Sequence, residues 1–162
     1  MNTRCALSLS IISLAGLAIA GAVPAAAEDQ SVADRLSQEG YKYEIDADGD
    51  YKLAFNYTDE GRSQLVFVSG ATETVAGLTI REVFSPAGRV TKDRIAGDKA
   101  LELLASSSQM KMGSWEIRGD VLYFVIKALD SASSSELRSM LAIVAETADN
   151  MEIKLSGDLD EL

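Results

Sequence analysis

The sequence predicts an α+β fold in which helices pack on a twisted antiparallel sheet of about five strands. Two features of the chain lead to this class. Short runs of alternating apolar and polar residues follow one another with only turns between them, and helical segments flank these runs instead of alternating with single strands. The expected order is one helix, three or four strands, a helix, two strands and a last helix. Residues 28–162 are expected to form one domain, long enough for a sizeable core.

Residues 1–27 are predicted to be a secretory signal peptide. Arg4 supplies a positive charge, the run 6–23 is apolar, and Ala25 and Ala27 have the small side chains that signal peptidase accepts. A retained membrane anchor is the alternative, but glycines and a proline weaken the apolar helix. We therefore expect cleavage, no stable membrane anchor afterwards, and a bacterial protein of the periplasm or a secreted one.

A short helix and a hairpin open the predicted domain. The helix is expected over 31–39, because Ser31 is a suitable N-cap and Gly40 a suitable stop. Residues 41–45 and 51–57 alternate between apolar or aromatic and polar side chains. They predict two strands that pair across the aspartates between them.

Further strands are expected in the middle and toward the end of the chain. One begins at Gln64, and another covers 78–84 and is ended by the serine, proline, alanine and glycine of 85–88. Residues 114–118 and 121–127 predict a second hairpin around a glycine and an aspartate. The second of these strands is apolar on both faces, so we expect it to be central in the sheet.

Two longer helices complete the prediction. One is expected to begin at Thr91 or Asp93 and to end near Ser107. The other begins with a capping box formed by Ser133 and Glu136. The core-facing stripe of the first would be Ile95, Leu101 and Leu104. That of the second would be Leu137, Met140, Leu141, Val144, Ala148 and Met151.

Composition excludes several classes of function. The chain has a formal net charge of −10 and contains no histidine. Such a surface repels phosphate backbones and anionic lipid, so we expect no nucleic-acid partner. The only cysteine, Cys5, lies in the predicted leader. The mature domain therefore has no disulfide, no thiol nucleophile and no zinc site of the usual nitrogen and sulfur ligands.

The stretch YEIDADGDYKLAF, residues 43–55, has some features of a calcium loop. An EF-hand loop needs oxygen ligands at positions 1, 3 and 5, glycine at 6 and glutamate at 12. A loop that begins at Asp46 has Tyr51 where the glycine belongs, and one that begins at Glu44 has Phe55 at the last ligand position. We therefore interpret the stretch as a hairpin turn and predict no metal ligand in it. A calcium-dependent module is the less favoured alternative.

No motif nominates a catalytic or cofactor-binding residue. The chain has no GxSxG, SxxK or Gly-rich phosphate-loop string, and many of its acidic residues stand in turns or near the C-terminus. We expect a protein without enzymatic activity and without a cofactor. A small hydrolase that uses two carboxylates is the alternative. Trp115 could stack on a ligand, but a lone tryptophan at the start of a strand is more typical of a core.

Five strings span most of the domain: LSQEGYKYEIDADGDYKLAF, QLVFVSG, MGSWEI, VLYFVIKA and VAETADNMEIKLSGDLDEL. Together they resemble a YbjN-type domain, a family of bacterial sensory-transduction regulators, over nearly all of residues 31–162. The resemblance implies a fold similar to type III secretion chaperones, often dimeric, and no enzymatic activity. The family lends no catalytic residues. Its members are commonly cytoplasmic, whereas this chain carries a predicted leader.

The leading hypothesis is an exported, non-catalytic module of the bacterial envelope that binds a protein or peptide partner as a chaperone or regulator. The missing catalytic inventory and the chaperone-like pattern motivate it. One long helix and two short ones can shield only part of a sheet of five or six strands. An apolar patch should therefore remain exposed, and a symmetric homodimer is the commonest way to close such a patch.

Overall fold

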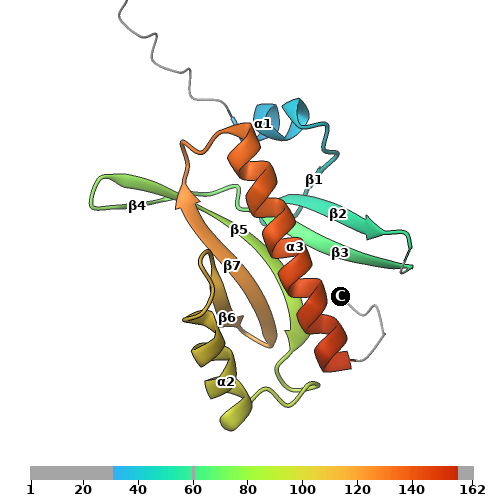
Figure 1. Cartoon of the computed structure of the whole chain (residues 1–162). Helices are drawn as coiled ribbons and strands as arrows, with labels where there is room; N and C mark the ends of the chain where they lie inside the picture. Colours follow the sequence, from blue (N-terminus) through green and yellow to red (C-terminus); the bar gives the residue numbers. More distant parts are fainter. Residues whose placement is uncertain (1–30, 60, 157–162) are drawn as a thin grey trace, which may run out of the picture.

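The computed structural model describes residues 31–59 and 61–156. Within them a long helix lies across one face of a seven-stranded antiparallel sheet (Figure 1). The predicted α+β class is confirmed, with more strands than expected, while the predicted leader lies outside the described residues. In chain order the elements are α1 (Val32–Gln38), β1 (Glu44–Ile45), β2 (Tyr51–Tyr57), β3 (Arg62–Val68), β4 (Glu73–Val75), β5 (Leu78–Arg89), α2 (Asp98–Ser107), β6 (Ser114–Arg118), β7 (Val121–Leu129) and α3 (Ser134–Ser156).

The long strand β5 organises the sheet. The strands lie in the order β1-β2-β3-β5-β7-β6, and β4 pairs with β5 alone. β3 and β4 therefore share one side of β5, while β7 occupies the other side. The hairpins β1–β2 and β6–β7 form as predicted. The β4–β5 hairpin protrudes from the body of the molecule (Figure 1).

The helix α3 covers one face of the sheet and begins with the predicted capping box. The Ser133 backbone N–H donates to Glu136 Oε2 at 2.7 Å, and the Glu136 backbone N–H donates to Ser133 Oγ at 3.3 Å. The helix packs on β3, β5 and β7. Its buried apolar side chains are Leu137, Met140, Leu141, Val144, Ala145 and Ala148. Burial stabilises the fold by roughly 1.5 to 3 kcal/mol for each large apolar side chain, so α3 is the main cover of the sheet.

A buried charge cluster ties the second half of α3 to the sheet. Arg62 on β3 donates to Asp149 Oδ1 from Nε at 3.0 Å and to Glu152 Oε2 from Nη2 at 3.3 Å. The three residues are only 8%, 6% and 2% exposed. Because a charge is costly to bury without its partner, sliding α3 along β3 would be strongly unfavourable.

A second charged cluster joins segments that are far apart in sequence. Asp130 follows β7, and its Oδ1 accepts from Arg35 Nη2 at 3.2 Å and from Arg81 Nε at 2.6 Å. Arg35 also donates to the carbonyl oxygens of Asp130 and Ala132, at 2.7 and 2.8 Å. Arg81 donates to the carbonyl oxygen of Gly70 at 3.1 Å. One carboxylate thus connects α1, the β3–β4 loop, β5 and the β7–α3 loop.

The predicted end of the fourth strand at 85–88 is wrong, because β5 continues through it with a bulge. Pro86 is tolerated there since the β3–β5 ladder has already stopped, and the proline's missing N–H faces no ladder partner. The Gln64 side chain fills this gap. Its Nε2 donates to Ser85 Oγ at 2.8 Å and to the Pro86 carbonyl oxygen at 2.7 Å.

The helix α2 differs from its prediction in both start and orientation. It begins at Asp98 and not at Thr91 or Asp93, because a glycine with positive φ occupies its N-cap. Most of the predicted core stripe faces outward, since Leu101 and Leu104 are 62% and 69% exposed. The helix lies at the border of the sheet and packs on the edge strand β6.

Asp130→Asn should lower the free energy of unfolding by about 1.5 to 3 kcal/mol at neutral pH, because two arginines lose their charged acceptor. A hydrogen bond from Arg81 lowers the pKa of Asp130, and with a second one from Arg35 it outweighs the opposite effect of burial. A carboxyl group with a lowered folded-state pKa stabilises above its unfolded pKa, and that stability is lost as pH falls through the folded pKa.

The difference between the wild type and Asp130→Asn should therefore shrink between about pH 5 and pH 2. Urea unfolding across this range measures it. A difference that does not depend on pH would show that the carboxylate charge is not what holds the four segments together.

Candidate binding grooves at the end of β7

The register places aromatic side chains on the sheet face opposite α3. On the covered face, Phe124 and Ile126 are 1% and 2% exposed. On the open face, Phe67, Phe84 and Tyr123 form a half-buried row. The Phe67 and Phe84 ring centroids are 5.2 Å apart and stacked, and those of Phe84 and Tyr123 are 5.7 Å apart. The rings therefore shield one another.

Four charged side chains form a ring of ion pairs over the middle of this open face. Arg118 Nη2 lies 2.9 Å from Glu82 Oε2 and 2.7 Å from Glu116 Oε2. Lys127 Nζ lies 2.8 Å from Glu116 Oε1 and 3.7 Å from Glu82 Oε1. Val125 lies among these strands and is only 1% exposed although it points to the open face. The charged ring and the aromatic row together cover it.

Partial burial raises the pKa of Glu116, but hydrogen bonds from Lys127 and Arg118 outweigh it, so that pKa lies below its usual value. Arg118 also lies over the rings of Phe84 and Tyr123, with its Cζ at 5.4 and 5.9 Å from the centroids. The middle of the open face is therefore a solvated, internally paired surface.

The end of β7 has an unpaired edge. β7 extends past the start of β6, because the ladder between them stops at Val125 (Figure 1). On the inner side the Asp130 N–H donates to the Thr79 carbonyl oxygen at 2.9 Å. Since backbone groups alternate in direction along a strand, the N–H groups of Lys127 and Leu129 point outward. Within the described residues no strand pairs with this edge.

An apolar groove, here called the helix-side groove, lies next to this edge between the end of β7 and the start of α3. Its volume is about 600 Å³. Met112 and Leu129 are 45% and 48% exposed at its mouth. The apolar residues that line it are Met112, Ala128, Leu129, Ala132 and Met140. Its size and lining suit one or two apolar side chains of a partner.

A second groove, here called the hairpin groove, lies beneath the β4–β5 hairpin on the open face and has a volume of about 690 Å³. Ala76 and Gly77 have φ values of 50° and 85°, as a two-residue hairpin turn requires. Val75 and Leu78 flank this turn and are 54% and 55% exposed. The sequence prediction missed β4, because three residues are too few to display an alternating pattern.

The aspartate-rich stretch forms the turn that was predicted. Asp46 Oδ1 accepts from the backbone N–H groups of Asp48 and Asp50, both at 3.0 Å, and Gly49 has φ 88°. Asp50 Oδ1 accepts from the Gly70 N–H at 2.9 Å. A Cβ at Gly70 would lie 2.0 Å from the Gly49 carbonyl oxygen, so the turn is pressed against the β3–β4 loop. Two of the aspartates therefore serve as acceptors for backbone groups.

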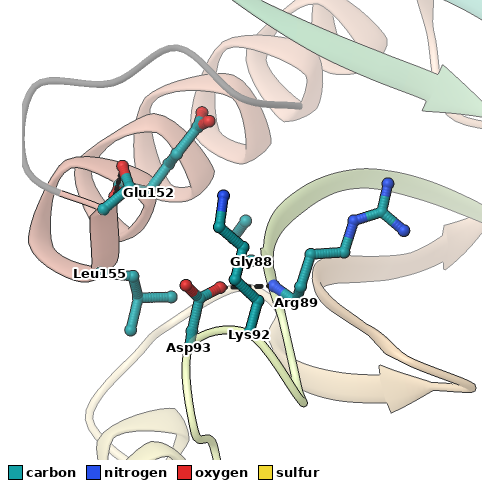
Figure 2. A pocket seen from close by; sticks show the side chains of 8 residues that line it. Gly88, Arg89, Lys92, Asp93, Glu152 and Leu155 are labelled. Atoms are coloured by element: carbon teal, nitrogen blue, oxygen red, sulfur yellow. Dashed lines mark hydrogen bonds between the residues drawn. The ribbon is translucent and has the colours of Figure 1, made fainter.

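Two acidic residues line a small cavity near the end of α3, and the Glu152 carboxylate points away from that of Asp93 (Figure 2). Asp93 and Glu152 line it with Arg89 and Lys92, and its volume is about 90 Å³. Figure 2 shows the Asp93 carboxylate turned toward the Arg89 backbone, whose N–H donates to Oδ2 at 2.6 Å. Glu152 is bound to Arg62. Since a water takes about 30 Å³ in the liquid, the cavity admits a few waters but no substrate.

Three further questions raised by the sequence concern the role of Trp115, metal binding and membrane-spanning helices. Trp115 packs on Phe124 at the margin of the core, with ring centroids 5.1 Å apart, in agreement with its interpretation as a packing residue. Across residues 31–59 and 61–156, no cluster of three acidic, cysteine or histidine side chains has the arrangement of a metal site. None of the helices in these ranges has both the length and the apolarity needed to cross a membrane.

No protein-family model matches the chain, and no characterised protein sequence matches it either. Among solved structures, the chain is similar to the Yersinia pestis type III secretion chaperone SycH, determined in complex with a stable fragment of YscM2. The alignment covers 74% of this chain and 94% of SycH, with 12% sequence identity and a TM-score of 0.49. The grooves are therefore interpreted from their own geometry.

Asp46→Ala should lower the free energy of unfolding by about 1 to 2 kcal/mol, because two backbone N–H groups lose their acceptor. Asp48→Ala should change it by less than about 0.5 kcal/mol, because Asp48 is exposed and contributes only its backbone here. Thermal unfolding of both variants, with added calcium and with chelator, measures this. A melting temperature that rises at micromolar calcium in the wild type and not in Asp46→Ala would contradict the turn interpretation.

Proposed function

We propose that this chain is an exported, non-catalytic module of the bacterial envelope that binds a protein or peptide partner. The observation that carries the proposal is the unpaired edge of β7 at Lys127 and Leu129 beside the helix-side groove. An extended segment could add to this edge through backbone hydrogen bonds and place an apolar side chain in the groove. Hydrogen bonds to the backbone would supply affinity, and the groove would select the side chain.

The remaining parts of the proposal rest on the sequence. The leader predicted at 1–27 supports export to the periplasm or beyond, and the resemblance to YbjN-type domains supports a regulatory or chaperone role. Within the described residues, the hydrolase alternative could use the carboxylates of Asp93 and Glu152, which line one cavity. Both are engaged by other groups, and their cavity is smaller than a substrate.

A labelled heptapeptide of alternating threonine and valine, blocked at both ends, tests this function on the mature chain. We expect it to bind in fluorescence anisotropy. Methylation of the backbone nitrogens on one side of the peptide should weaken binding about tenfold, and methylation on the other side should leave binding unchanged, since only one side faces β7. Ile117→Ser on β6 is the matched control for Leu129→Ser, because the two residues are 49% and 48% exposed.

Three outcomes would contradict this function: no binding of any peptide, equal effects of the two methylation patterns, or a loss of binding in Ile117→Ser as large as in Leu129→Ser. Mass spectrometry of the peptide after incubation between about pH 4 and pH 7 separates the enzymatic alternative. We expect the peptide to remain intact, and its cleavage would favour the hydrolase.

We further propose that the chain forms a homodimer through α2. Leu101 and Leu104 lie one turn apart on the helix and are the most exposed large apolar residues of the described chain. Pairing with a second copy would remove both from water. Sedimentation at tens of micromolar should therefore find a dimer. The double variant Leu101→Ser with Leu104→Ser should be a folded monomer, and a monomeric wild type would contradict the proposal.

A further inference from the structure

We propose that the hairpin groove is a second docking surface, and that it receives a segment of a partner protein in which lysine or arginine stands next to aliphatic residues. This surface lies on the sheet face opposite α3, apart from the helix-side groove. Three observations carry the inference: the register of its aliphatic side chains, their exposure, and an acidic residue that makes no ion pair within residues 31–59 and 61–156.

The register gathers aliphatic side chains on one face of the hairpin. Val75 lies opposite Leu78, and Ile80 lies opposite both Glu73 and Leu129. Because directly paired residues point to the same face, these side chains form two adjacent rows on the open side of the sheet. The other face of the hairpin carries the paired threonines Thr74 and Thr79. The hairpin is therefore amphipathic.

The aliphatic face has no cover in the described part of the molecule. Residues 71–79 are all exposed, and Val75 and Leu78 are 54% and 55% accessible. A hairpin of three residue pairs gains little stability from apolar residues that stay in water. Their placement over a groove of about 690 Å³ is instead typical of a surface that a partner covers.

The charges around the hairpin groove favour a partner segment with a positive charge. Glu82 is neutralised by Arg118 at 2.9 Å and by Lys127 at 3.7 Å. Lys127 in turn lies 2.8 Å from Glu116. Glu73 lines the groove beside Ile80 and makes no ion pair within the described residues. The net charge of −10 on the whole chain adds an attractive field for cations. A cationic side chain next to Glu73 would complement this site.

Two hexapeptides test the inference on the mature chain: one alternates leucine with lysine, the other leucine with glutamate, and a leucine and threonine peptide is the neutral reference. We expect the lysine peptide to bind best. Glu73→Lys should weaken its binding about fivefold, the range of one favourable surface charge pair, and should improve binding of the glutamate peptide. Glu146→Lys makes the same change in net charge on the exposed side of α3 and should alter binding by less than about twofold.

Leu78→Ser tests the aliphatic face, with Ile45→Ser on β1 as the control of similar exposure, 54% against 55%. Leu78→Ser should weaken all three peptides and Ile45→Ser none. Equal effects of Glu73→Lys and Glu146→Lys would overturn the charge selection, since only the overall field would then act. Peptide binding that is insensitive to Leu78→Ser would overturn the hairpin groove as the docking surface. Loss of binding in Leu129→Ser alone would leave the function proposed for the edge of β7 standing.

Discussion

One long helix covers one face of a seven-stranded sheet, while the helices of the described residues leave the opposite face without a helical layer. The rest of the structure depends on this difference between the two faces. α3 buries its apolar stripe against β3, β5 and β7, and Arg62 holds its second half in place through Asp149 and Glu152. The helix α1 packs on α3, and α2 packs on the edge strand β6. The opposite face of the sheet therefore has to be stabilised without a helical layer, since an apolar sheet face is costly to leave in water.

The open face meets this constraint in two different ways. In its middle, Phe67, Phe84 and Tyr123 pack against one another, and four paired charges close over Val125. At the end that carries the β4–β5 hairpin the aliphatic residues stay exposed, and β7 runs past its neighbour without a strand partner. The open face of the sheet thus has a middle part whose apolar residues are covered by neighbouring side chains, and an end whose apolar residues and strand edge are exposed. A partner would bind most favourably at this exposed end, because it could cover apolar area there and form backbone hydrogen bonds with the edge of β7.

Local patterns in the sequence were sufficient to predict most of the helices and strands, but they did not predict the grooves. The alternation around the aspartates predicted β1 and β2, and the Ser133 and Glu136 pair predicted the start of α3. Pro86 and Gly88 predicted an end of β5 that tertiary structure overrides, because the Gln64 side chain replaces the missing ladder. The stripe of Leu101 and Leu104 was predicted to be core, since periodicity identifies an apolar side of a helix but not what faces it. The grooves depend on where ladders stop, which only pairing between distant segments determines.

Local sequence patterns did not predict the charge clusters either. Asp130 has no local motif, and its role follows from meeting Arg35 and Arg81 in space. Asp149 and Glu152 belong to the otherwise mostly apolar buried stripe of α3, and their ion pairs with Arg62 on β3 explain their burial. Gly77 between the apolar residues Val75 and Leu78 could have indicated the β4–β5 hairpin, because glycine readily takes the positive φ of such turns, whereas Ala76 takes it only at a steric cost.

The central claim is that the end of the sheet around the hairpin and β7 is free to receive a partner, while the face beneath α3 is not. Methyl NMR of the protein with a soluble paramagnetic agent tests this most directly. The methyl signals of Val75, Leu78 and Leu129 should broaden strongly, and those of Val66, Leu141 and Val144 should be protected. Equal protection of both groups would contradict the account, because the proposed surfaces would then already be covered in the isolated protein.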